Sequence, residues 1–186
     1  VDIKTAQIYR ELGMNDRARR LSRTVYDRST SQRQNAAFLL AMLAVYPAEQ
    51  KRWLTRCDKS EPIVVQRLME VEADLLAQAG EFAKAEAKLA KLFTLQLKEA
   101  DISPASANNA ANTLASRYAL TGNRQHLEQA ISLLRRSLRQ KPGHRIVIGN
   151  LYKMLTYRIR LDVLGQWLDL KTLKLGSGEV QSVVET

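Results

Sequence analysis

Apolar positions along this chain follow helical spacing, and glycines interrupt them at recurring points. A small residue is followed by a bulky one at i+3, then by a glycine and an alanine. Glycine ends a helix cheaply because it adopts positive φ, and alanine lets a second helix approach closely. The pattern therefore predicts repeated helical hairpins. It occurs three times, the last alanine coming three residues late: Ala6, Tyr9, Gly13 and Ala18; Ala73, Leu76, Gly80 and Ala85; Ala115, Tyr118, Gly122 and Ala130.

Capping residues and prolines give the expected helix boundaries. Pro47, Pro62 and Pro104 suit the first turn of a helix, and Pro142 ends one. Alternating strand-like runs are nearly absent, since 146–148 is the only candidate and is too short. Besides a first helix closed by Gly13 and one opened by Pro47, the expected helices cover 16–27, 32–45, 62–80, 81–100, 104–121, 126–140, 144–157 and 161–175.

The most apolar segment is the run 36–45, in which all ten residues are apolar. A membrane-spanning helix needs about 20 apolar residues, so this run is too short to be one. It predicts instead the most buried helix of the stack. At 186 residues and 45% apolar content, the chain is long enough for one domain with a continuous core.

The residues of this pattern resemble the tetratricopeptide repeat family, in which such hairpins recur about every 34 residues. The best match is 112–142, followed by 73–92 and 6–25. The resemblance implies an all-α fold, an α-solenoid of about four antiparallel helix pairs forming a right-handed superhelix. It implies a single domain over 1–175, with units 1–28, 32–58, 62–100 and 104–142, a degenerate last pair 144–175, and a flexible tail 176–186.

Several segments depart from the family pattern. The second unit lacks the glycine and has Tyr46–Pro47 at its turn, and 123–126 resembles an insertion of about three residues. The connection 98–106 is longer than usual. The last unit, around Gly149 and Tyr152, fits only in its first helix. These departures weaken the expected regularity of the superhelix but not its helical nature.

The positive charge is concentrated in one third of the chain. The formal net charge is +10, and the segment 117–160 holds ten Lys or Arg against a single acid, Glu128, which gives +9. Such a surface attracts acidic proteins, nucleic acid or anionic lipid, although cations on helices commonly form only a solvated face. The resemblance places second helices on the convex side. The candidate basic surface there is Arg135, Arg136, Arg139 and Arg145.

The resemblance also implies a concave groove lined by first-helix residues. Asparagine offers both a donor and an acceptor, so it can bind the backbone of an extended peptide. Alternatively, Asn108, Asn109 and Asn112 merely solvate the start of a helix. The acids in the row argue against a carboxylate clamp for a peptide C-terminus. Carried over by register, the groove positions are Gln7, Arg10, Glu11, Arg67, Glu70, Asp74, Gln78, Asn109, Asn112, Ser116, Asn150 and Lys153.

Catalytic and cofactor motifs are not recognisable. His126 and His144 lack metal-ligand spacing and are expected on the surface or in loops, and Cys57 is expected in the core. We therefore predict no enzyme activity, no catalytic or metal-binding residue and no cofactor. Tyr9, Tyr118 and Tyr152 are expected to fill the core by the repeat register.

Two functional hypotheses follow. The first is a protein–protein interaction scaffold, part of a larger bacterial-style protein, which binds a peptide or partner protein in its groove. The alternative is binding of nucleic acid or an acidic surface through the basic third. RNA-reading repeats vary their base-reading residues at fixed positions, and Arg10, Ala77, Ala119 and Lys153 do not follow such a code. The opening valine suggests a fragment or processed terminus, compatible with the cytoplasm, which is slightly favoured, or the periplasm.

Overall fold

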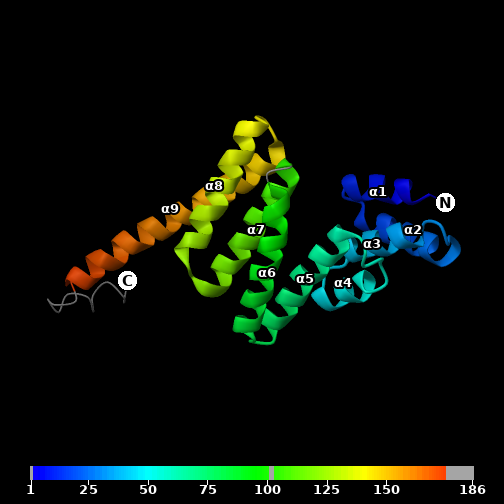
Figure 1. Cartoon of the computed structure of the whole chain (residues 1–186), viewed down its shortest axis with the longest axis horizontal. Coiled ribbons are helices and arrows are strands. Elements are labelled where there is room, and N and C mark those ends of the chain that lie inside the picture. Colours follow the sequence, from blue (N-terminus) through cyan, green and yellow to red (C-terminus); the bar gives the residue numbers. More distant parts are fainter. Residues whose placement is uncertain (1, 101–102, 175–186) are drawn as a thin grey trace. The chain divides into compact units, whose positions relative to one another are not determined.

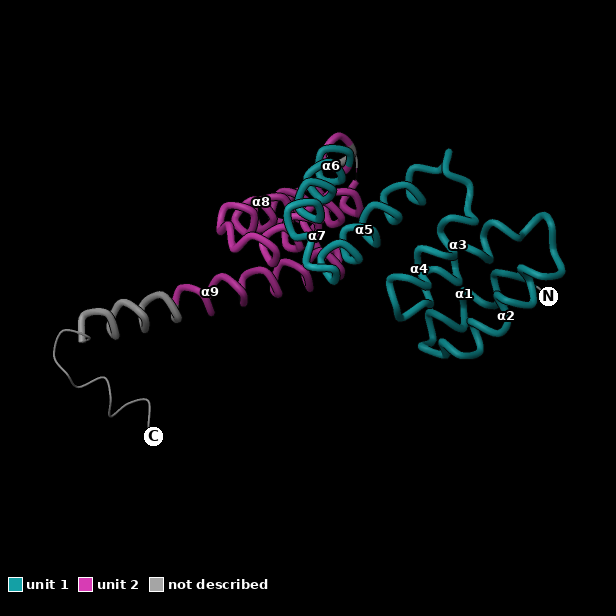
Figure 2. The backbone as a smooth tube through the Cα atoms, turned by 90° about the horizontal axis from the view of Figure 1, so that it is seen from below, with its two compact units in different colours: residues 1–95 teal, residues 96–186 magenta. Residues whose placement is uncertain are grey.

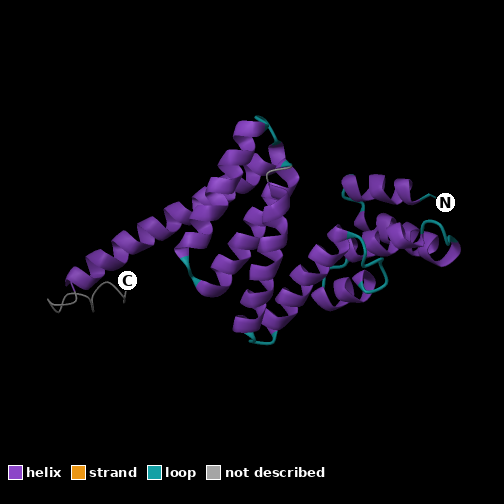
Figure 3. Ribbon diagram, viewed as in Figure 1, coloured by secondary structure: helices purple, strands orange, loops and turns teal. Residues whose placement is uncertain are grey.

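Helices make up the regular structure throughout the described part of the chain. The computed structural model describes the backbone of residues 2–100 and 103–174 and the side chains of 2–98 and 103–162. The helices follow one another through short turns (Figures 1 and 3). They are α1 (Ile3–Glu11), α2 (Asn15–Arg28), α3 (Arg33–Leu43), α4 (Pro47–Leu54), α5 (Pro62–Gln78), α6 (Phe82–Ala100), α7 (Pro104–Thr121), α8 (Arg124–Gln140) and α9 (Arg145–Lys174).

The chain divides into two compact units, 1–95 and 96–186, with the boundary inside α6 (Figure 2). In the first unit, α1, α2, α3, α4 and α5 each pack against the next, and α1 also contacts α3. In the second unit, α8 packs against α7 and α9, and α7 contacts α9. Packing between consecutive helices confirms the all-α prediction. Each of the four segments expected to form a unit, from 1–28 to 104–142, contains two of the helices α1 to α8.

The turn between α7 and α8 shows how glycine ends the first helix of a hairpin. Gly122 has φ 66°, and its N–H donates to the carbonyl of Tyr118 at 2.8 Å. Gly13 and Gly80 have positive φ as well, as the pattern predicted. The segment 123–126, expected to be an insertion in the repeat, begins α8, because the Asn123 side chain accepts from the N–H of Gln125 at 3.0 Å and so caps the helix.

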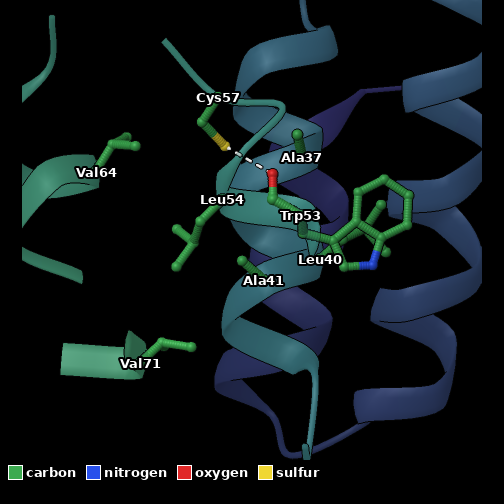
Figure 4. Packing of buried hydrophobic residues seen from close by; sticks show 8 residues of the cluster. All are labelled: Ala37, Leu40, Ala41, Trp53, Leu54, Cys57, Val64 and Val71. Atoms are coloured by element: carbon green, nitrogen blue, oxygen red, sulfur yellow. Dashed lines mark hydrogen bonds between the residues drawn. The ribbon is translucent and has the colours of Figure 1, made fainter. Parts of the chain in front are cut away.

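Helix α3 is buried on two faces, which confirms that the apolar run forms a deeply buried helix. Ala36, Leu39 and Leu43 pack in a cluster with residues of α1 and α2. On the other side, α3 packs with residues of α4 and α5 in a second cluster (Figure 4). The buried members of this second cluster are Ala37, Leu40, Ala41, Trp53, Leu54, Cys57, Val64 and Val71.

In the second unit, the core face of α7 is rich in alanine. The adjoining helix α8 supplies larger buried residues, and Val147 and Met154 are buried on α9. Ala115, the small residue of the repeat pattern on α7, is only half-buried. The fully buried positions lie a turn earlier, and the buried residues of the pair α7 and α8 include Ala107, Ala110, Ala111, Leu114, Leu127, Ala130, Ile131 and Leu134.

The expected last helix pair is wrong. Residues 145–174 form one continuous helix instead of two helices, 144–157 and 161–175. The residues between the two expected helices, 158–160, are Arg-Ile-Arg and contain neither a glycine nor a proline that would end a helix. The expected tail 176–186 and residue 175 lie outside the described residues.

The prediction that Tyr152 fills the core is also wrong. Its side chain is 74% exposed on α9, whereas Tyr9 and Tyr118 are half-buried. Tyr9 packs against the cluster that α1 forms with α2 and α3. The buried residues of α9, Val147 and Met154, lie on another side of the helix from Tyr152.

Glu72 on α5 links three helices of the first unit. Its carboxylate lies 3.1 Å from the ammonium of Lys51 on α4 and forms an ion pair with Lys88 on α6. The hydrogen bond from Lys88 is the main cause that lowers the pKa of Glu72, and Lys51 adds to it, while partial burial opposes both. The ionised carboxylate therefore stabilises the packing of these helices.

We expect Gly122→Val to lower the thermal midpoint of unfolding, because a side chain at this positive φ costs about 1–3 kcal/mol. The matched control is Gly149→Ala within α9, where an added Cβ meets nothing within 4 Å. Alanine favours a helix by about 1 kcal/mol over glycine. The control should therefore raise the midpoint. Equal midpoints for Gly122→Val and the wild type would contradict the role of this turn.

Glu72→Gln should lower the thermal midpoint at about pH 7 by an amount worth at most roughly 1 kcal/mol, because the pairs are partly exposed. A lowered folded-state pKa stabilises the fold above the unfolded pKa, and this contribution is lost as the pH falls. The variant and the wild type should therefore converge near about pH 3. Glu11→Gln, at an exposed position at the end of α1, is the control. A loss that is independent of pH would exclude the ionic contribution.

Candidate functional site

The predicted groove residues all lie on the first helices of hairpins or on α9, but they divide between the two units. Gln7 and Arg10 are exposed on α1, and a longer row lies on α5. The remaining residues lie on α7 and α9 of the second unit. The predicted residues thus fall into two sets, one in each unit: Gln7, Arg10 and Glu11 on α1 with Arg67, Glu70, Asp74 and Gln78 on α5; and Asn109, Asn112 and Ser116 on α7 with Asn150 and Lys153 on α9.

Two of the four α5 residues, Arg67 and Glu70, pair with each other. Arg67, Glu70, Asp74 and Gln78 follow the spacing i, i+3, i+7 and i+11, which places them on one face. Arg67 and Glu70 form an ion pair. Desolvation raises the pKa of the Asp74 carboxyl, and the charge of Arg67 opposes this shift. The ion pair thus occupies part of the hydrogen-bonding capacity of this row.

The α7 residues form what we call the asparagine row: Asn109, Asn112 and Ser116. Asn109 is half-buried, and the other two are exposed. Their spacing of three and four residues keeps them on one face of the helix. The row thus presents two amides and a hydroxyl to solvent along α7.

One buried and one partly buried hydrogen bond flank the asparagine row. On one side, the hydroxyl of Thr113 donates to the side-chain carbonyl of Gln96 on α6 at 2.7 Å, and both residues are buried. On the other side, the amide of Asn150 on α9 donates to the amide carbonyl of Asn108 at 2.7 Å. These bonds fix the rotation of α7 and so the direction in which the row faces.

Asn150 therefore contributes to packing as well as to the predicted groove. Its partner, Asn108, is buried. The alternative that this asparagine solvates the start of the helix therefore does not hold for Asn108. The sequence analysis grouped Asn108 with Asn109 and Asn112. Asn108 differs from them because it lies on the side of α7 that faces α9. Lys153 is exposed, with its ammonium 5.8 Å from the ring centroid of Tyr157.

The residues of the candidate basic surface lie on α8 and at the start of α9. Arg135 and Arg139 are exposed on α8, and Arg145 is the exposed first residue of α9. Arg136 is half-buried. Glu128, the single acid of this segment, lies 3.6 Å from Arg158 on α9. That pair offsets one arginine and leaves a net positive surface.

Sequence reasoning missed a cluster of arginines stacked on aromatic rings in the first unit. The guanidinium groups of Arg23 and Arg56 each lie 4.7 Å from the ring centroid of Trp53. Tyr26 packs edge-on against Trp53 with ring centroids 5.2 Å apart, and Arg33 lies 5.7 Å from its ring. These contacts join residues that are distant in the sequence, and no spacing signal identifies them.

The candidate nucleophile and ligands occupy structural positions. Cys57 is buried, its thiol donates to the carbonyl of Trp53, and burial raises its pKa to about 11. His144 lies in the loop before α9, as predicted. The prediction that His126 lies on the surface or in a loop is wrong. Asn123 caps α8, and His126 is buried in the first turn of this helix.

No group of three or more His, Cys, Asp or Glu side chains in the described part of the chain could hold a metal ion. Among the helices of the same described part, none has the length and apolar character needed to cross a bilayer.

An open cavity of about 510 Å³ lies between α1 and α2. None of the predicted groove residues lines it, although Tyr9 does. Its other lining residues include Asp2, Thr5, Arg17, Arg20, Leu21 and Thr24. The mixed charges of this lining do not indicate a particular ligand.

Comparisons with protein-family models, with curated proteins and with solved structures return no match to this chain. The resemblance to tetratricopeptide repeats accordingly rests on the residues of this sequence alone.

Proposed function

We propose that this protein is an interaction scaffold that binds an extended segment of a partner protein along the asparagine row of its second unit. The observation that carries the proposal is the pair of hydrogen bonds on either side of the row, one buried and one partly buried. They hold Asn109, Asn112 and Ser116 in a fixed direction without using the polar atoms of these three side chains. Ordering of α7 before binding reduces the entropic cost of association.

The chemistry of the row favours a polypeptide backbone as the ligand. Each asparagine can donate one hydrogen bond and accept another, which matches the alternating N–H and C=O groups of an extended peptide. The row itself carries no charge, so it gains little from phosphate groups. The α5 row is a weaker candidate because Arg67 and Glu70 already pair with each other.

The repeat interpretation is part of this proposal. Packing between consecutive helices, the contacts of α1 with α3 and of α7 with α9, and the glycine turns all support helical hairpins stacked in a solenoid. A superhelix of the tetratricopeptide type would place α7 and α9 on its concave side. The proposed site would then lie in the groove.

The basic surface supports a second candidate function, binding of nucleic acid or of an acidic protein surface. Its basis is the exposure of Arg135, Arg139 and Arg145 in a segment of net charge +9. Such a surface would act mainly through long-range attraction, which accelerates association and weakens as salt is added.

The asparagine row can be tested with a partner captured by the purified chain and then purified itself. We expect Asn109→Ala/Asn112→Ala to raise the dissociation rate constant about tenfold, because two hydrogen bonds are worth about 0.5–1.5 kcal/mol each. The control, Gln129→Ala/Ser132→Ala, changes two exposed polar residues of α8. Wild-type dissociation of the asparagine variant would refute the proposed site.

The two candidate functions differ in their response to salt. Replacing Arg135, Arg136 and Arg139 with Gln should slow association and flatten its dependence on ionic strength, while leaving the dissociation rate nearly unchanged. The measurement is a kinetic titration at two salt concentrations. Complete loss of binding in this variant, together with normal binding by the asparagine variant, would move the working surface to α8.

A further inference from the structure

An apolar stripe lies exposed along α9. Ile148, Tyr152 and Ile159 are 45%, 74% and 57% exposed, and their spacing of four and seven residues places them on one face of the helix. Helix α9 packs against α7 and α8, and its buried residues Val147 and Met154 face another side. Aligned exposed apolar side chains of this size mark interaction surfaces more often than chance exposure does.

The corresponding face is covered in the other hairpins. Tyr9 on α1 and Tyr118 on α7 hold the same position after a small residue, and both are half-buried in hairpins completed by α2 and α8. Tyr152 follows Gly149 with the same spacing, but α9 continues without a turn. The stripe is thus the face against which a second helix would pack.

Gly149 adds an independent observation about the shape of this face. A Cβ placed on Gly149 would meet no atom within 4 Å. The glycine therefore leaves open space beside Tyr152, and another helix could pack closely against α9 there. Alanines at fully buried positions allow the same close approach between α7 and α8.

The charges beside the stripe indicate what covers it. Between Arg145 and Asp162, α9 carries four Lys or Arg and a single acid, Asp162, which forms an ion pair with Arg124 of α8. Arg158 pairs with Glu128, whereas Arg145, Lys153 and Arg160 are exposed. An acidic partner would complement these cations. A second copy of α9 would instead place cations against cations, which disfavours a homodimer through this face.

The width of the stripe favours a helix over a membrane surface. Its three residues lie within about 40° around the α9 axis, as in the narrow seam between two packed helices. Ile146 and Tyr157 are also exposed on α9, but they lie further around the axis, and Lys153 and Arg160 separate them from the stripe. A helix that lies in a bilayer interface presents a broader apolar face.

We infer that the stripe of α9 is a docking site for an amphipathic, acidic helix of a partner protein, which lies along Ile148, Tyr152 and Ile159 as a second helix lies along the first in the other hairpins. Its apolar side chains cover the stripe, and its carboxylates face Arg145, Lys153 and Arg160. This surface does not use the asparagine row, so the two sites can be tested separately.

The probe is a synthetic amphipathic helix with leucine in every a and d position and glutamate in the flanking positions, labelled for fluorescence anisotropy. We expect it to bind the full chain, and we expect Ile148→Ser/Ile159→Ser to weaken binding on the order of tenfold. A probe with lysine in place of glutamate should bind more weakly than the acidic probe. Ile8→Ser, at an exposed isoleucine of α1, is the control and should bind normally.

Circular dichroism of the stripe variant checks that it remains folded, as expected for substitutions at exposed positions. Absence of binding, or equal binding by the wild type and the stripe variant, would overturn the inference. So would a chain that sediments as a dimer and becomes monomeric in the stripe variant, since this identifies a second copy as the occupant. Binding to phosphatidylserine vesicles that the stripe variant loses, without binding of the acidic probe, would identify a membrane surface instead.

Discussion

Close contact between helices through alanine is the constraint on which both units depend. Ala6 and Ala18 are fully buried in the first hairpin, and Ala110 and Ala130 are fully buried in the pair α7 and α8. An alanine contributes little apolar area itself, but it lets helix axes approach to about 8–10 Å, so larger neighbours such as Leu114 and Leu134 become buried. Helix α3 extends this arrangement to two faces, with Ala36 on one side and Ala37 on the other.

Local signals in the sequence predicted most of the helices because they act within a few residues. Gly13, Gly80 and Gly122 end helices through their backbone freedom, and Pro47 begins one. The same local reasoning failed for α9, where the family pattern suggested a turn but the residues 158–160 supply no helix-ending signal. The exposure of Tyr152 follows from the same difference, since burial of a residue depends on whether a later segment returns to cover it.

The candidate site could be predicted only in part. The spacing of Asn109 and Asn112 was sufficient to place them on one face of a helix, and the structure keeps both on the accessible side of α7. The sequence could not distinguish them from Asn108, because that residue is buried by a hydrogen bond to Asn150, distant in the chain. The contacts of Arg23 and Arg56 with Trp53 are long-range in the same sense, and helical periodicity contains no information about them.

The buried hydrogen bond between Thr113 and Gln96 restricts how α6 and α7 align along their length. A face made largely of alanine, such as that of α7, is smooth, and helices could slide along it by a turn at small cost in apolar burial. Gln96 is only 1% exposed, and its amide nitrogen already lacks a partner. Any sliding that separated it from Thr113 would leave the carbonyl unpaired as well, at about 1–3 kcal/mol. The hydrogen bond between Gln96 and Thr113 thus favours one alignment of α6 and α7 over alignments shifted by a turn, rather than adding to the stability of the fold.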